Sequence, residues 1–169
     1  MQHPSDGSAL DPHEKSQQIS GVWLFPSSYI VHLAEEYFIA GGFPHWVEST
    51  FALRFSNREF VAWNALALAL MCVGAWLVSR DPKFRFIEIA LSIAVLGNVV
   101  AHALASAVSW TYSPGLITGI VMWIPLGTVR LRIARKATSL RARVAGTYLG
   151  IGVVLMTVVV LALNALLSR

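Results

Sequence analysis

The sequence predicts an all-α integral membrane protein, a bundle of about five transmembrane helices with one short interfacial helix. Of the 169 residues, 56% are hydrophobic and only 13% are charged, whereas soluble domains carry about 25% charged residues. The apolar residues also form runs that approach the roughly 20 residues a helix needs to cross a bilayer. Five such spans use almost the whole chain and leave little for a soluble domain.

The N-terminal region divides into a tail, a first span and an interfacial helix. Residues 1–18 are polar and lack hydrophobic periodicity, so we expect a disordered cytoplasmic tail. The first span, 19–40, is followed by the helix-stopping sequence Gly41-Gly42-Phe43-Pro44. Residues 45–57 mix aromatic and charged side chains and are too short and polar to span, which favours an amphipathic helix at the interface.

Four further spans follow and complete a transmembrane bundle over residues 19–168. We expect them at 59–78, 84–110, 116–129 and 145–167. The third of these four is short and contains Pro125, so a re-entrant segment is the alternative there. In that case the C-terminus would lie on the opposite side of the membrane.

Basic residues gather in the turn at 80–83 and in an expected loop at 130–143. With five spans these two connections share one side, and the positive-inside rule places that side and the N-terminus in the cytoplasm. We therefore expect a multi-pass protein of the cell (inner) membrane. The net charge of +4 does not indicate a nucleic-acid partner, because the basic residues lie at span ends and form no groove.

The first and third spans carry polar residues at positions where a bilayer makes them costly. His32, Glu35 and Glu36 share one face of the first span. An ionised acid at the bilayer centre costs about 2.5–3.5 kcal/mol, so such residues are rare and usually functional. Asn98 and His102 share a face of the third span at a comparable depth, since both spans run in the same direction. The sequence thus predicts one polar site.

Two imidazoles and two carboxylates are suitable ligands for a divalent metal. Zinc is the first expectation, and iron or manganese would accept the same ligands. The expected ligands are His32, Glu35, Glu36 and His102. A metal-bound water of lowered pKa would give hydrolytic or acid–base chemistry, with one of the two glutamates as general base and Asn98 orienting a ligand or polarising the substrate.

We expect three residues, Tyr112, Gly115 and Asn64, to line the mouth of the pocket or contact the substrate. Tyr112 and Gly115 belong to a tight turn with Pro114, and Asn64 lies deep enough in the second span to face the site. The interfacial helix, which repeats the H-x-x-E spacing at His45, either lies on the membrane surface or covers the pocket as a lid.

These features support three hypotheses of function. The leading one is a metal-dependent membrane enzyme acting on a hydrophobic or lipid-like substrate that enters laterally from the bilayer. The second is a proton- or cation-coupled transporter or ion-binding protein that uses the same residues. The third is a non-catalytic membrane subunit whose polar cluster docks a partner helix. An oligomer is compatible with all three.

Three motifs in this order resemble the HXXEE family of small integral membrane proteins. The defining motif reads His32-Leu33-Ala34-Glu35-Glu36, and an N-x-x-x-H motif follows at Asn98 and His102. A Tyr-Ser-Pro-Gly-x-x-Thr element occupies residues 112–118. The resemblance covers roughly residues 25–135. The family is named for its motif, so the resemblance implies the residues of the site and no particular reaction.

Overall fold

The computed structural model describes residues 21–167, and the side chains of residues 21–159. All regular secondary structure in this part of the chain is helical. The elements are α2 (Leu24–Phe38), α3 (Phe43–Phe51), α4 (Asn57–Arg80), η1 (Pro82–Phe84), α5 (Arg85–Ser109), α6 (Leu116–Thr118), η2 (Gly119–Trp123), α7 (Ile124–Lys136) and α8 (Leu140–Leu167). The expected tail at 1–18 lies outside the described residues.

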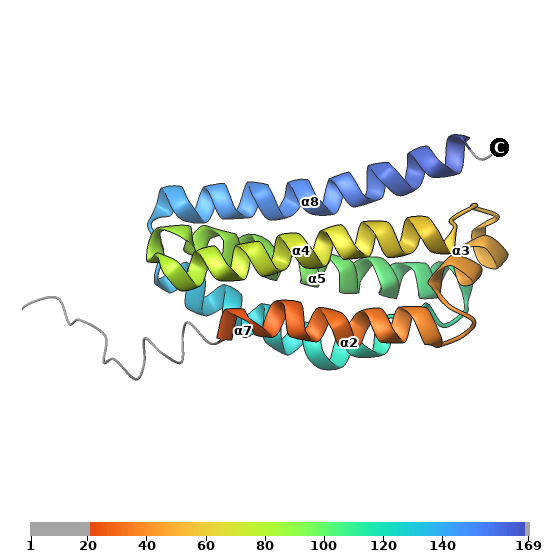
Figure 1. Cartoon of the computed structure of the whole chain (residues 1–169), viewed down its shortest axis with the longest axis horizontal. Helices are drawn as coiled ribbons and strands as arrows, with labels where there is room; N and C mark the ends of the chain where they lie inside the picture. The colour runs from red at the N-terminus through yellow and green to blue at the C-terminus, as the bar shows by residue number, and fades with distance from the viewer. Residues whose placement is uncertain (1–20, 168–169) are drawn as a thin grey trace, which may run out of the picture.

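The long helices lie side by side along one axis, and α5 is in the middle of the bundle (Figure 1). It packs against α8, α7 and α4, and α2 lies beside α4 and reaches α6 and η2. One end of the bundle carries α3 and the connection from α5 to α6, which we call the α3 end. The other carries the α4–α5 and α7–α8 connections, which we call the basic end.

Within the described part of the chain, four helical segments are long and apolar enough to cross a membrane. They are Asn57–Arg80, Pro82–Ser109, Leu116–Lys136 and Leu140–Val159. The all-helical, membrane-like architecture is therefore confirmed, but the count of five spans is not. The helix α2 is not among them: its 15 residues measure about 22 Å at 1.5 Å per residue, against a hydrocarbon core of about 30 Å.

The helix α2 ends at Phe38, two residues before the predicted end at 40, because the chain leaves helical geometry before Gly41. At its start, Gly21 and Val22 are helical and Trp23 forms a turn, and residues 19–20 lie outside the described residues. Ala40, Gly41 and Gly42 all have positive φ angles of 54°, 81° and 90°, which turn the chain into α3. That helix covers Phe43–Phe51, rather than the whole of the predicted 45–57. A new helix begins after Ser56, whose side chain accepts a hydrogen bond from the Glu59 backbone while the Glu59 carboxylate accepts one from the Ser56 backbone.

The fourth predicted span is longer than 116–129 and crosses the bundle without a break (Figure 1). Its helical path runs through a π-helical turn, Gly119–Trp123, directly before the turn that contains Pro125. Proline has no N–H to donate, so the widened turn comes where the regular hydrogen-bond pattern is interrupted. The basic residues between Arg130 and Lys136 lie in α7, where we had expected a loop.

The buried core lies where α2, α4, α5 and η2 meet. Its members are Val22, Phe25, Tyr29, Ala75, Val78, Val95, Val99 and Trp123. Toward the basic end, this core adjoins a buried ion pair between Glu88 of α5 and Arg130 of α7, whose Oε1 and Nη2 atoms are 2.5 Å apart. The apolar core therefore separates this ion pair from the buried polar residues nearer the α3 end, His32, Glu36 and His102.

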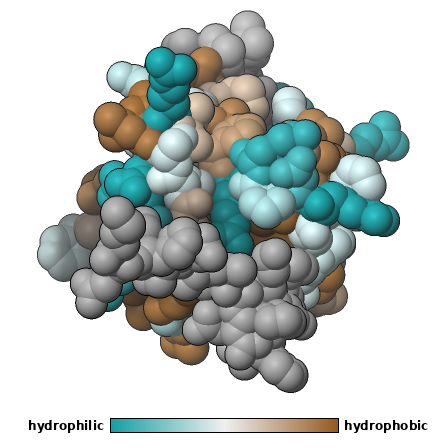
Figure 2. All heavy atoms as spheres, turned by 90° about the vertical axis from the view of Figure 1, so that its left-hand side faces the viewer, coloured by the Kyte–Doolittle hydropathy of each residue, from teal (hydrophilic) through white to brown (hydrophobic). Residues whose placement is uncertain are grey.

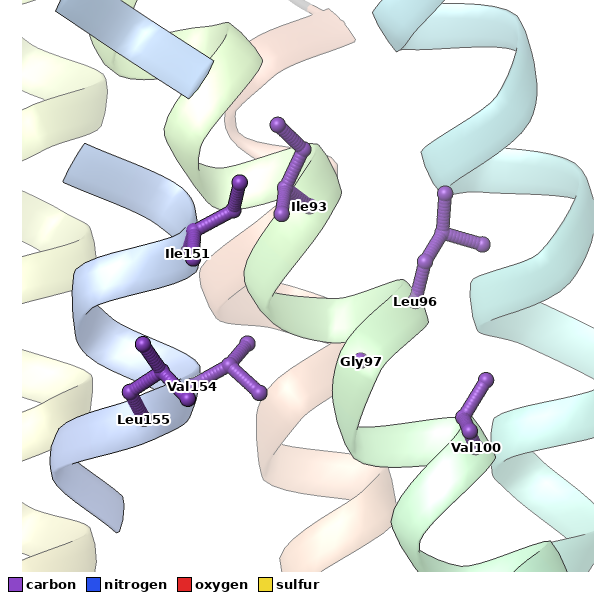
Figure 3. Close-up of a pocket in the computed structure, with 7 residues that line it drawn as sticks. All are labelled: Ile93, Leu96, Gly97, Val100, Ile151, Val154 and Leu155. Atoms are coloured by element: carbon purple, nitrogen blue, oxygen red, sulfur yellow. The ribbon is translucent and has the colours of Figure 1, made fainter. Parts of the chain in front are cut away.

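The helix α8 packs on α5 through small residues. A Cβ added at Gly146 would lie 2.4 Å from the Phe86 carbonyl oxygen, and one at Gly150 would lie 3.0 Å from that of Ala90, so glycine is what allows this close approach. Further along the two helices an apolar groove of about 310 Å³ opens (Figure 3). Its lining side chains are all aliphatic, so it holds no ligating group.

Candidate metal site

Two histidines and one glutamate from different helices meet near the α3 end. His32 and Glu36 lie one turn apart on α2, and His102 lies on α5. One ligand atom from each falls within 4.8 Å of the others. The Glu36 Oε1 atom lies 3.5 Å from His32 Nε2 and 3.2 Å from His102 Nε2. The three residues are 0%, 6% and 5% exposed.

The helical periodicity of α2 brings these groups inward. Its buried residues Phe25, Tyr29, His32 and Glu36 recur at spacings of four, three and four, which form one stripe on a helix. The stripe faces the interior of the bundle, where His102 extends the buried side of α5 beyond Val99. The convergence of His32 with His102 is the arrangement that the sequence predicts.

Both imidazole rings are fixed at their second nitrogen. His32 Nδ1 is 2.8 Å from the Thr118 hydroxyl, and His102 Nδ1 is 2.8 Å from the Ser113 hydroxyl. Each ring thus turns its Nε2 atom toward the Glu36 carboxylate. Histidines that bind metals are held in this way, because a hydrogen bond at one nitrogen sets the tautomer and the orientation of the other.

Aromatic rings enclose the His32 side of the cluster. The ring centroids of Trp123 and His32 are 3.8 Å apart. Tyr29 stacks on Trp123 with a centroid distance of 6.0 Å and an interplanar angle of 5°. The Tyr29 hydroxyl donates a hydrogen bond to the Asn64 amide oxygen. Asn64, which we had expected at the pocket mouth, is thus linked to the site by its hydrogen bond with Tyr29. The sequence does not single out Trp123 as a neighbour of the site, because nothing sets it apart from other tryptophans in apolar runs.

The helix α3 lies over the His102 side. The ring centroid of Phe43, its first residue, lies 5.6 Å from that of His102. Trp46 donates a hydrogen bond from Nε1 to the Thr111 hydroxyl at 3.1 Å. The lid alternative for this segment thus has contacts that support it, although His45 itself is exposed.

Glu35, the first glutamate of the motif, points to a different partner. Glu35 accepts hydrogen bonds from the Tyr112 hydroxyl and from the backbone N–H groups of Gly115, Ile117 and Thr118 at 3.1, 3.0 and 2.7 Å. Burial, together with the bond to this carboxylate, raises the pKa of the Tyr112 phenol above its ordinary value, so the phenol stays protonated and donates. Glu35 lies outside the group of three ligand atoms.

The backbone at Gly115 closes over all three ligating residues. A Cβ added there would lie 2.8 Å from His32 Cε1, 2.9 Å from His102 Cε1 and 3.0 Å from Glu36 Cγ. Its φ angle of +99° is also one that glycine adopts readily. Gly115 therefore lies against the site, whereas Tyr112 contacts Glu35. Their expected role as the mouth of a pocket stays a prediction.

The structure does not join Asn98 to the cluster by a hydrogen bond. It lies one turn before His102 on α5, and its Oδ1 atom is buried without a hydrogen-bond partner among the described residues. Its expected role toward a ligand or substrate stays a prediction.

The separations from Glu36 to the two imidazoles are compatible with a small dication. Zinc binds nitrogen and oxygen at about 2.0–2.2 Å, which places the ligand atoms of a tetrahedral site about 3.3–3.6 Å apart. The 3.2 and 3.5 Å separations from Glu36 to the two imidazoles are close to that spacing. Two histidines and one carboxylate also form the ligand set of many iron(II) sites.

Comparison with protein families matches the chain to a family described as "Protein of unknown function with HXXEE motif". The match covers residues 23–130, from the start of the described bundle to Arg130 in α7. Comparisons with curated proteins and with solved structures give no match. The matched segment exceeds half of the chain and contains the whole His/Glu/His cluster with its surroundings, so this protein belongs to the HXXEE family.

Proposed function

We propose that the protein is a metal-dependent integral membrane enzyme in which His32, Glu36 and His102 hold one divalent cation. Zinc is the first choice, and iron or manganese would accept the same ligands. The observation that carries the proposal is the convergence of three buried ligand atoms within 4.8 Å. The hydroxyl anchors on both Nδ1 atoms support it, because they orient the rings as a metal would require.

A bound dication would also resolve an electrostatic problem. Glu36 is buried with its carboxylate facing two imidazoles, and a buried ionised group is costly unless it is paired or coordinates a metal. The three residues belong to a bundle whose described part has four membrane-length apolar helices, and ionisable side chains within such bundles are rare and are mostly paired or functional.

The number of ligands favours catalysis over a purely structural site. Structural zinc sites use four protein ligands, whereas catalytic sites use three and leave one position for water or substrate. A metal in such a site lowers the pKa of bound water or polarises a carbonyl or phosphoryl oxygen. Glu35 is occupied by four hydrogen-bond donors, so we no longer assign it the role of base, and Asn98 is the candidate for orienting the substrate.

The substrate class follows from the surroundings. The outward faces of α4 and α8 are apolar, with exposed residues that include Leu70, Val73, Leu155 and Val158, as a bilayer requires. A substrate that reaches the site from the side would have to be hydrophobic or lipid-like. A transporter would instead need a polar path along the bundle, and the core around Phe25, Val95 and Trp123 lies between the cluster and the basic end. This favours the enzyme.

Elemental analysis of the detergent-purified protein tests the metal. We expect about one equivalent of zinc, iron or manganese in the wild type, and its loss in His32→Ala and Glu36→Gln. His45→Ala is the matched control, because His45 belongs to the same spacing motif but is exposed on α3. A wild type that takes up none of the three metals, even after reconstitution, would overturn the proposal.

Catalysis needs its own test. Wild type loaded with the metal and Glu36→Gln are each incubated with a total membrane lipid extract, and the products are compared by mass spectrometry. We expect a product that appears only with the wild type and disappears when a chelator removes the metal. Identical lipid profiles would make the site a metal centre without this enzymatic role.

A further inference from the structure

One short segment supplies every contact that closes the candidate metal site from the α5–α6 side. We call residues 111–118 the cover loop. Ser113 and Thr118 hold the two imidazoles at Nδ1, and Gly115 lies against all three ligating side chains. The orientation of both histidines and the access to them therefore depend on the position of this segment.

The cover loop is held in place by the Glu35 carboxylate. All four hydrogen bonds that Glu35 accepts come from this loop: one from the Tyr112 hydroxyl and three from backbone N–H groups of Gly115, Ile117 and Thr118. Three of these donors lie at the start of the helical segment Leu116–Lys136, where unpaired N–H groups and the helix dipole favour an anion.

With the cover loop in this position, the three ligating residues are almost completely shielded from the outside of the molecule. They are at most 6% exposed, so neither a cation nor a substrate reaches them unless something moves. The loop has features that would permit movement at both ends. Trp110, just before it, is 93% exposed with a φ angle of 54°, and the π-helical turn Gly119–Trp123 follows it. Such turns occur often at functional sites.

We propose that Glu35 is a positioning residue that latches the cover loop over His32, Glu36 and His102, and that release of this latch admits metal or substrate. That Glu35 controls the entry of metal or substrate rests on the proposed metal function. That it holds the cover loop over His32 and His102 can be tested in the metal-free protein. The two adjacent glutamates of the motif then have different tasks. Glu36 belongs to the site, and Glu35 controls the segment that closes it.

Chemical labelling of histidine tests this without any metal. The metal-free, detergent-purified protein is treated with diethylpyrocarbonate, and the labelling rate of each histidine is followed by peptide mass spectrometry. His45 is exposed and serves as the internal reference. In the wild type we expect fast labelling of His45 and slow labelling of His32 and His102. In Glu35→Gln the rates at His32 and His102 should rise about tenfold or more, with His45 unchanged.

Two further variants make the result specific. Tyr112→Phe removes one donor to Glu35 and should raise the two rates less than Glu35→Gln does. It also carries the test should Glu35→Gln fail to fold. Glu48→Gln is the control, because it removes an exposed carboxylate from α3 and should change none of the rates. Circular dichroism and gel filtration establish that each variant remains folded.

The outcomes separate this inference from the proposed function. Unchanged labelling of His32 and His102 in the folded Glu35 and Tyr112 variants would overturn the latch, even if the wild type binds zinc. An equal rise at all three histidines would also overturn it, because that indicates general loosening. Increased labelling confined to His32 and His102 supports the latch, and it does so even if elemental analysis finds no metal.

Discussion

Gly115 is the residue on which the geometry of the site depends most directly. Its missing side chain lets the backbone touch His32, Glu36 and His102 at once, and its amide donates to Glu35. A glycine in this place meets two requirements together. It adopts a φ angle of +99° at little cost, and it leaves no Cβ where three side chains already meet.

Replacing this glycine by alanine should therefore damage the site and the fold together. We expect Gly115→Ala to lower the free energy of unfolding by about 1–2 kcal/mol through the left-handed backbone alone, and to reduce the bound metal to well below one equivalent. Thermal unfolding and elemental analysis measure the two effects. Gly152→Ala is the control, because nothing lies within 4 Å of its added Cβ and alanine favours a helix over glycine. Equal metal content in both variants would contradict this reading of Gly115.

At the residue scale, the sequence was enough to predict which residues meet in the cluster, but not how the contacts of Glu35 and Glu36 differ. The i, i+4 spacing of His32 and Glu36 and the depth of His102 are enough to predict that they meet, because helical periodicity fixes both. The difference between Glu35 and Glu36 was not predictable. The two lie next to each other on the same helix face, and only the path of a segment 82–83 residues further along the chain decides which of them it binds.

Among the elements, α8 differs from the others in what it contributes. It lies outside the segment matched by the family and at the edge of the bundle (Figure 1), and no ligating residue of the cluster belongs to it. It packs on α5 through Gly146 and Gly150, so its attachment depends on backbone proximity. We infer that α8 stabilises α5 and is dispensable for metal binding.

A bulky residue at this contact tests that separation. Gly146→Leu would place side-chain atoms where the Phe86 carbonyl now lies, 2.4 Å from the added Cβ, and should displace α8 from α5. We expect a lower thermal unfolding temperature and faster proteolysis in the connection from α7 to α8, while the metal content stays as in the wild type. Gly152→Leu provides the matched substitution without a neighbour. Loss of metal in Gly146→Leu alone would show that the site depends on α8.

The bounds of the elements were predictable where the sequence changes sharply and less so elsewhere. The Gly-Gly-Phe-Pro stop and the Ser56 cap set clear ends. The helix that ends at Lys136 was predicted too short, because its proline and its arginines both suggested an end near Val129. Buried contacts overrule those signals. Arg130 is neutralised by Glu88 inside the bundle, and the π-helical turn accommodates Pro125.

The whole molecule is asymmetric in charge along its long axis. Residues 80–85 and 130–143, at the basic end, contain nine of the chain's 13 lysines and arginines, and Figure 2 shows hydrophilic side chains gathered on this end. The described acids there are already in ion pairs, Asp81 with Lys83 and Glu88 with Arg130. Composition alone was enough to predict the membrane bundle, whereas the number of spans depends on the length of the first helix, whose described part α2 has 15 residues.

This asymmetry makes a prediction about orientation. By the positive-inside rule the basic end should face the cytoplasm and α3 the opposite side. In a background with Cys72 replaced by serine, single cysteines at Ala137 and Asn57, both exposed and at opposite ends of the bundle, report on the two sides. A membrane-impermeant maleimide should label Asn57→Cys in intact cells and Ala137→Cys only after permeabilisation. The reverse pattern would invert the assigned orientation. Labelling of both in intact cells would contradict a bundle whose ends lie on opposite sides of the membrane.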